Sequence, residues 1–249
     1  MPGNLAAVTG PSSFRLGYVP GVTPAKWVRI WAERFPRVRL ELIPVAADDA
    51  AALVRRGEAD AVLLRLPIDR DGLHAIPLYV EQTVVVVPKD HLVTAADDVT
   101  TEDLADDLTL YPLDDVLGWD RPPGRVIDER PATTADAVAL VAMGTGVLVV
   151  PQSLARLHHR KDLTYRPLTD APESQVALTW PQDDASELVE QFIGIVRGRT
   201  VNSTRGPSPT QKTTKKDAEK TTQKATQKST KKTAKQAPAG GRRKPSRRR

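Results

Sequence analysis

The fold class is decided by the segment PATTADAVALVAMGTGVLVVPQSLAR, residues 131–156. Thr133 and Thr134 favour a helix start, because a hydroxyl accepts hydrogen bonds from the free backbone N–H groups of a first turn. Gly144 predicts a left-handed end to that helix. The run VLVV at 147–150 then predicts a strand buried on both faces, and the proline after it can open another helix. This succession of helix, tight turn, buried strand and helix indicates an α/β domain.

The composition of the 249 residues excludes several classes of protein. There is no cysteine, which excludes disulfides, thiol nucleophiles and cysteine zinc sites. The first 13 residues lack the basic start and apolar stretch of a secretory signal. No apolar run approaches the roughly 20 residues that a membrane span needs. We therefore expect a soluble cytoplasmic protein that does not contact a membrane.

The charges are strongly segregated along the chain. From Arg205 to the end there are 16 Lys/Arg and 2 Asp/Glu, a net charge of +14. The whole chain has 36 basic and 31 acidic residues, so residues 1–204 keep 20 basic and 29 acidic groups, a net charge of −9. The sequence therefore joins an acidic body to a cationic tail.

The body begins with an alternation of strands and helices. Thr23 before Pro24 predicts the start of the first helix, with the proline in its first turn, and Asp48 or Asp49 can cap the second. A last amphipathic helix is predicted to start at residues 184–186. The predicted elements are a strand at 14–18, a helix at 24–35, a strand at 38–44, a helix at 50–57, a buried strand at 61–64, strands near 163–168 and 176–180, and the last helix to 196.

Several segments, in this order, resemble the effector-binding domain of LysR-type transcriptional regulators. They are FRLGYVP at 14–20, FPRVRLELIPV at 35–45, RRGEADAVLL at 55–64, GLHAIPLYVEQTVVVVPKDH at 72–91, TTEDLADDLTLYP at 100–112, and the 131–156 segment. The resemblance covers about residues 14–199. It implies an α/β, two-lobed fold of the type 2 periplasmic-binding-protein kind, a role in transcription regulation, and pairing into homodimers.

The composition of the two ends and the resemblance together predict a division of the chain. We expect a loose N-terminus at 1–13, a first lobe at about 14–79 and 182–199, a second lobe at about 80–181, and a Lys/Arg-rich tail at 200–249. The chain is expected to cross between the lobes near Tyr79–Glu81 and Trp180–Gln182.

Two features depart from the family pattern. Only 13 residues precede the first predicted strand, so we expect no winged helix-turn-helix and no linker helix in this sequence. The segment LDDVLGWDRPPGRVIDERP at 113–131 contains prolines and glycines and predicts a loop in place of a family helix. Because that region contributes to the effector pocket in the family, the ligand of a relative does not transfer to this chain.

The candidate ligand-binding residues lie at predicted strand ends and helix starts, where free N–H groups suit a small anion. They are Tyr18, Thr23, Arg65, Thr133 and Thr134. Two alternatives stay open: Arg65 could instead pair with Asp60 or Asp69, and the two threonines at 133 and 134 could only cap a helix. Adjacent His158 and His159 face different directions, so we expect no metal site, and no motif predicts an enzyme or a cofactor.

The tail has no aromatic or branched aliphatic residue beyond Val201, so we expect disorder there. Dispersed cations without aromatics suit the phosphate backbone of duplex DNA rather than specific single-strand recognition. The tail also resembles the lysine-rich tails of actinobacterial nucleoid proteins, although a merely solubilising appendage is the alternative. The candidate DNA-contacting residues are Lys212, Lys215, Lys216, Lys224, Lys228, Lys231, Lys232, Lys235, Arg242, Arg243, Lys244, Arg247, Arg248 and Arg249.

These observations predict a non-enzymatic, LysR-like regulator that senses a small, anionic metabolite between two lobes. It would associate with DNA non-specifically through its tail and lie at the nucleoid. The alternative is a small-molecule-binding or partner-binding module, or a dimeric scaffold, without a direct role in transcription.

Overall fold

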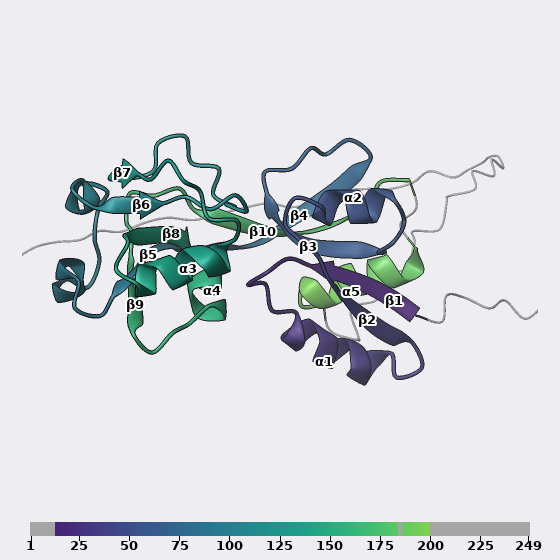
Figure 1. Ribbon diagram of the computed structural model, residues 1–249. Helices are drawn as coiled ribbons and strands as arrows, with labels where there is room; N and C mark the ends of the chain where they lie inside the picture. The colour runs from purple at the N-terminus through teal and green to yellow at the C-terminus, as the bar shows by residue number, and fades with distance from the viewer. Residues whose placement is uncertain (1–12, 184–185, 200–249) are drawn as a thin grey trace, which may run out of the picture. The chain divides into compact units, whose positions relative to one another are not determined.

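The computed structural model describes residues 13–183 and 186–199, which form two five-stranded sheets (Figure 1). The first has the order β2-β1-β3-β10-β4 and the second β7-β6-β8-β5-β9. The strands are β1 (Ser13–Tyr18), β2 (Arg39–Pro44), β3 (Ala61–Leu66), β4 (Leu73–Glu81), β5 (Thr83–Pro88), β6 (Leu108–Leu110), β7 (Arg125–Val126), β8 (Val147–Pro151), β9 (Leu163–Pro167) and β10 (Ser174–Pro181). The two sheets confirm the predicted two-lobed α/β fold. Residues 1–12 and the predicted tail at 200–249 lie outside the described residues.

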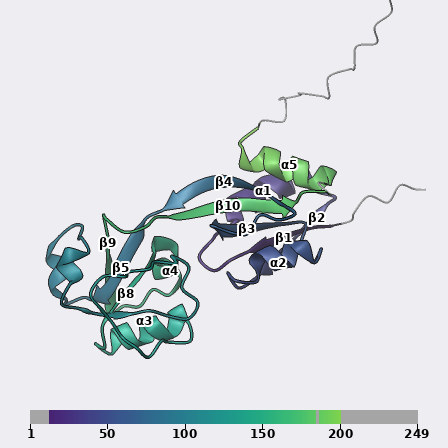
Figure 2. The same cartoon turned by 90° about the horizontal axis from the view of Figure 1, so that it is seen from above.

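The first lobe has helices on both faces of its sheet. Its helices are α1 (Ala25–Arg34), α2 (Ala50–Arg55) and α5 (Glu187–Val196). Figure 2 shows α1 and α5 over one face and α2 over the other. Strand β1 pairs in parallel with β2 and β3, whereas β10 runs antiparallel between β3 and β4. A sheet covered on both faces explains why β3 begins with a buried apolar run at 61–64.

The second crossover between the lobes differs from the prediction. The first lies at Gln82, between β4 and β5, next to the predicted position. The chain returns to the first sheet between Pro167 and Ser174, so the crossover expected near Trp180–Gln182 is wrong. Strand β10 pairs with β3 on one side and with β4 on the other, so it belongs to the first sheet and the chain crosses back before β10 begins. Its apolar pattern reveals a buried strand but does not tell which sheet the strand joins.

The second lobe buries both faces of its sheet. Val84 and Val86 of β5 pack in one core cluster with residues of α3 (Thr134–Ala142) and α4 (Gln152–Leu157). Val85 and Val87 pack in the other, with residues of the 3-10 turns η1 (Leu92–Ala95) and η2 (Glu102–Leu104). Strand β8 alternates in the same way, which confirms the strand predicted at 147–150 and its two covered faces.

Local rules predicted most helix ends correctly. The Thr133 hydroxyl accepts from the backbone N–H of Asp136 at 3.1 Å, and Gly144 has a φ of 77°. Asp49 and Thr23 are the exceptions. Asp49 lies at the N-cap position of α2, but its side chain makes no capping hydrogen bond, and Thr23 does not cap α1. The backbone N–H groups of Trp27 and Val28 both donate to the carbonyl of Pro24, so the first helical acceptor is the proline and Thr23 lies one residue outside the cap.

An aromatic cluster fills the core of the first lobe between β1, α1 and α5. The rings of Phe14 and Trp31 stack with centroids 4.8 Å apart, and Phe192 lies 5.1 Å from Phe14. The indole N–H of Trp31 donates to the carbonyl of Val38 at 3.0 Å, so this buried ring keeps no unsatisfied donor. The cluster ties the C-terminal helix to the first strand and helix of the domain.

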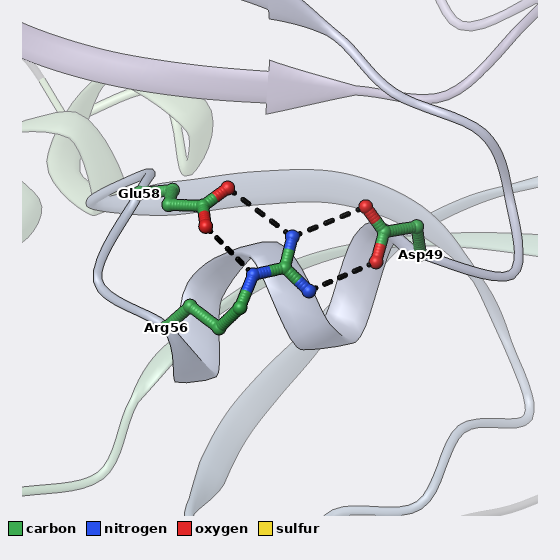
Figure 3. Close-up of polar contacts among 3 residues, drawn as sticks. All are labelled: Asp49, Arg56 and Glu58. Atoms are coloured by element: carbon green, nitrogen blue, oxygen red, sulfur yellow. Dashed lines mark hydrogen bonds and ion pairs between the residues drawn. The ribbon is translucent and has the colours of Figure 1, made fainter.

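Arg56 clamps the two ends of α2 (Figure 3). Its guanidinium donates to Asp49 before the helix, at 3.0 and 3.2 Å, and to Glu58 after it, at 2.7 and 3.1 Å. These bonds lower the pKa of both carboxyl groups from their ordinary values of 3.8 for Asp49 and 4.5 for Glu58. A six-residue helix has few hydrogen bonds of its own, and this clamp links the residue before the helix to the turn after it.

We expect Arg56→Gln to destabilise the protein at neutral pH and to lose that effect in acid. Carboxyl groups with a lowered folded-state pKa stabilise the fold above their unfolded values and stop doing so as the pH falls through the folded values. The difference in unfolding midpoint between wild type and variant should therefore shrink below about pH 4, as measured by urea unfolding from pH 7 to 3. Arg37→Gln is the control, because Arg37 is exposed and pairs with no carboxylate among residues 13–183 and 186–199. A constant difference at every pH would contradict this role of the clamp.

Phe192→Ala should cost about 3–5 kcal/mol in unfolding free energy, because a fully buried ring leaves a cavity when it is truncated. Phe192 is 0% exposed and contacts both other rings of the cluster. Leu92→Ala, at a side chain that is 89% exposed, provides the control and should change stability by less than about 0.5 kcal/mol. Denaturant unfolding followed by tryptophan fluorescence measures both variants, and equal effects would exclude the aromatic cluster as the centre of this core.

Candidate functional site

Two contiguous cavities lie where the lobes meet. The larger cavity has a volume of about 1140 Å³ and the smaller one about 630 Å³. Pro20 and Ala46 of the first lobe and Leu157 of the second line both of them. The smaller volume is within the range of small-molecule sites, and the larger is slightly above it. We call the two cavities together the cleft.

The smaller cavity brings together three of the five predicted ligand residues. Arg65 at the end of β3 comes from the first lobe, and Thr133 and Thr134 at the start of α3 come from the second. The loop 113–116 and residue His158 complete the wall of the second lobe. Arg65 and the two threonines therefore line one cavity from opposite lobes.

Arg65 is held by protein groups on several sides. Its Nε donates to Glu81 at 3.0 Å, Nη1 donates to the carbonyl of Pro20 at 2.9 Å, and Nη2 donates to the hydroxyl of Ser153 at 2.9 Å. Arg65 and Glu81 are both buried, so the two charges compensate each other away from water. Through Ser153 the same guanidinium joins the first lobe to α4 of the second.

The alternative partners expected for Arg65 were wrong. Asp60 pairs with Arg15 at 2.7 Å, and Asp69 pairs with Arg55 at 3.0 Å. Glu81 lies 16 residues after Arg65 and reaches it because β3 and β4 flank the same strand, β10. No spacing in the sequence signals a contact of this kind.

The start of α3 already has carboxylates beside it. The buried hydroxyl of Thr134 donates to Asp114 at 2.9 Å, and the exposed hydroxyl of Thr133 donates to Asp136 at 2.7 Å. Negative charge at a helix start is favourable, and here the protein supplies it. The helix end predicted to attract an anion therefore faces the cleft beside acidic groups.

The loop that bears Asp114 is fixed at its base. The backbone N–H of Leu113 donates to the carbonyl of Pro131 at 2.9 Å. Arg130 donates to the carbonyls of Tyr111 and Pro112 at 2.9 and 2.6 Å, and its guanidinium lies 4.4 Å from the centre of the Tyr111 ring. Burial and the nearby Asp115 carboxylate raise the pKa of the Tyr111 phenol.

In this loop Trp119 packs against the core cluster that holds η1 and η2.

The larger cavity contains the other two predicted residues, Tyr18 and Thr23. Its wall is mainly apolar, with Arg29 of α1 and Arg156 of α4 as its charged residues and no Asp or Glu in its lining. Sequence reasoning missed both arginines and Ser153. The helical spacing of α1 would place Arg29 on its polar side, but nothing in the sequence indicates that α4 of the other lobe reaches the same cavity.

The described residues offer no group of three or more His, Cys, Asp or Glu side chains that could hold a metal ion. His158 lines the smaller cavity, but its neighbour His159 does not. Within the same residues, no helix is both long enough and apolar enough to cross a membrane.

A model of the LysR substrate binding domain matches residues 12–200. The chain therefore belongs to this family, the effector-binding domains of LysR-type regulators. It is 32% identical over 155 residues to a probable hydrogen peroxide-inducible genes activator of Mycobacterium avium, covering 57% of this chain and 50% of that protein. It is 27% identical over 180 residues to the HTH-type transcriptional regulator AlsR of Bacillus subtilis (strain 168), covering 68% and 59%.

Solved structures show the same fold. The effector binding domain of BenM with its effector benzoate has a TM-score of 0.64 at 20% identity, covering 75% of this chain and 90% of that one. The oxidized form of OxyR has a TM-score of 0.62 at 22% identity, covering 75% and 95%. The chain spans about half the length of the curated relatives it matches. Those relatives are transcriptional regulators rather than enzymes.

Arg65→Met should reduce the unfolding free energy by about 3–5 kcal/mol, because Glu81 would stay buried without a counter-ion. The double variant Arg65→Met with Glu81→Met should recover most of that loss, since an apolar pair of similar volume needs no compensation. Urea unfolding of the wild type, both single variants and the double variant gives the coupling free energy. Additive effects of the two single changes would contradict a buried ion pair at this position.

Proposed function

We propose that this protein is a non-enzymatic regulator that senses a small molecule in the cleft between its lobes. The observation that carries the proposal is the smaller cavity, which is lined by Arg65 from one lobe and Thr133 and Thr134 from the other. A ligand that contacts both walls binds the closed arrangement of the lobes more tightly, which shifts the conformational population. We also propose that Tyr18 and Thr23 contact the ligand from the adjoining larger cavity.

We further propose that the segment 205–249 associates the protein with DNA. Its net charge is +14, whereas that of residues 1–204 is −9. Lys and Arg that neutralise phosphates release counterions, which gives affinity without sequence preference. The acidic body should repel the phosphate backbone, so DNA affinity is assigned to the tail. On this proposal the protein is a homodimer of the cytoplasm, associated with the nucleoid.

Removal of residues 205–249 should abolish binding to duplex DNA. For contacts to 6–10 phosphates, the affinity of the full chain should fall by about 10³–10⁵ between 50 and 200 mM salt. Electrophoretic mobility shifts with two unrelated duplexes of equal length, over a salt series, measure both effects. Equal affinity for the two duplexes is expected because phosphates carry no sequence information.

The matched control is a full-length chain in which the 14 candidate tail residues are changed to Gln. It keeps the length of the tail and should bind DNA as weakly as the truncated protein. If the 1–204 protein bound DNA as well as the full chain, the tail assignment would be wrong. If the tail bound DNA but the body bound no small molecule, the result would favour the alternative, a partner-binding module or dimeric scaffold.

A further inference from the structure

The two cavities of the cleft differ sharply in charge. The lining of the larger cavity includes Arg29 and Arg156 and no acidic residue. The lining of the smaller cavity includes Asp48, Asp114 and Asp115. The two cavities share Pro20, Ala46 and Leu157 in their linings, so the basic and acidic ends adjoin each other at these three residues.

The basic end has no counter-ion from the described protein. Within residues 13–183 and 186–199, no ion pair joins Arg29 or Arg156 to a carboxylate. Arg156 donates through its Nε to the phenol oxygen of Tyr165 at 3.3 Å, which leaves its charge uncompensated. The neighbouring start of α1 has neither a side-chain cap nor an acidic residue in its first turn, which adds positive potential at the same place.

The carboxylates at the acidic end likewise have no positively charged partner among the described residues. Asp114 accepts from the hydroxyl of Thr134, and Asp115 accepts from the backbone N–H of Gly118 at 2.8 Å, so these bonds come from neutral groups. Across the described part of the chain neither these two residues nor Asp48 forms an ion pair. Arg65 lines the same cavity, but its charge is already balanced by Glu81. The smaller cavity therefore presents net negative charge.

Apolar groups lie between the charged ends. Pro20, Ala46 and Leu157 form the shared wall, and Val22, Val28 and Val45 extend it into the larger cavity. These side chains offer an apolar surface to the body of a ligand whose charged groups lie at the two ends. A ligand with one charge would complement one end and leave the other without a partner.

We propose that the cleft binds a zwitterion, a small molecule with a carboxylate and an ammonium group at opposite ends of an apolar body. The carboxylate lies between Arg29 and Arg156, the ammonium group lies beside Asp48, Asp114 and Asp115, and the body contacts the apolar wall. This inference rests on the proposed sensing function and specifies its ligand class. It differs from the sequence prediction, which placed an anion at Arg65 and the start of α3.

The test uses unbranched ω-amino acids of increasing length, each compared with the alkanoic acid and the alkylamine of the same length. Isothermal titration calorimetry with the full chain measures the affinities. At the best-fitting length, the amino acid should bind at least about 10-fold more tightly than either singly charged analogue, the gain of one charge-assisted contact. Equal or tighter binding of the acid or the amine at every length, or no binding by any amino acid, overturns the inference.

Variants at the two ends give an independent readout. The double change Arg29→Gln with Arg156→Gln should weaken the amino acid about 10-fold or more and leave the amine unaffected. Asp114→Asn with Asp115→Asn should weaken it similarly and leave the acid unaffected, while the Asn at 114 can still accept from Thr134. Arg37→Gln and Asp128→Asn, at exposed positions outside both cavity linings, are the matched controls and should change nothing.

The outcomes separate this inference from the proposed function. If an uncharged or singly charged metabolite stabilises the full chain in a thermal-shift screen, and Ala135→Trp in the smaller cavity abolishes its binding, sensing stands and the zwitterion is excluded. If no compound of any charge class binds, the sensing function itself fails. Loss of the preference for the amino acid over the amine in the arginine variant, and over the acid in the aspartate variant, supports the inference, and an unchanged preference in both variants overturns it.

Discussion

The buried ion pair between Arg65 and Glu81 is the interaction on which the boundary between the lobes depends. One partner ends β3 and the other ends β4, directly before the chain crosses to the second lobe. The same guanidinium also donates to Pro20 in the β1–α1 loop and to Ser153 in the second lobe. A buried guanidinium requires partners for its donors, and here the requirement fixes three segments of chain around one crossover. A side chain at position 21 would crowd this arrangement, because its Cβ would lie 2.6 Å from the Ser153 hydroxyl and 3.0 Å from Arg65. Gly21 leaves the space free.

This arrangement changes the chemistry that Arg65 offers. An arginine with a carboxylate partner at 3.0 Å does not present a free positive charge to the cleft. Among the described residues that line the cleft, Arg29 and Arg156 at one end and Asp48, Asp114 and Asp115 at the other form no ion pair. In our proposal the specificity of the cleft therefore comes from side chains of α1, α4 and the loops before α2 and α3, rather than from the strand ends. Loops and helix ends supply specificity in many folds, because the scaffold below them tolerates their variation.

The 113–131 loop contributes acidic side chains to the wall of the smaller cavity. Its base is closed by the bond from Leu113 to Pro131 and by the bonds from Arg130 to Tyr111 and Pro112. These contacts hold Asp114 beside Thr134 and carry Trp119 into the core cluster around η1 and η2. The loop thus brings acidic side chains to the wall where a helix start alone would have favoured an anion. Membership of the LysR substrate binding domain family identifies the fold, and this loop gives the cleft of this chain its own charge.

The sequence by itself determined the elements and the fold family. Local patterns predicted the two-faced burial of the strand at 147–150, the cap at Thr133 and the left-handed turn at Gly144, because each depends on neighbours within a few residues. Only the tertiary structure decided which distant groups meet. It paired Arg65 with Glu81, placed β10 in the first sheet, and brought Arg156 of α4 into a cavity with Arg29 of α1. Such contacts depend on the register of strands and the approach of two lobes, which no local pattern encodes. Three of the five predicted ligand residues line one cavity, whereas Arg29 and Arg156, on which the proposed ligand class rests, were not among the predicted residues.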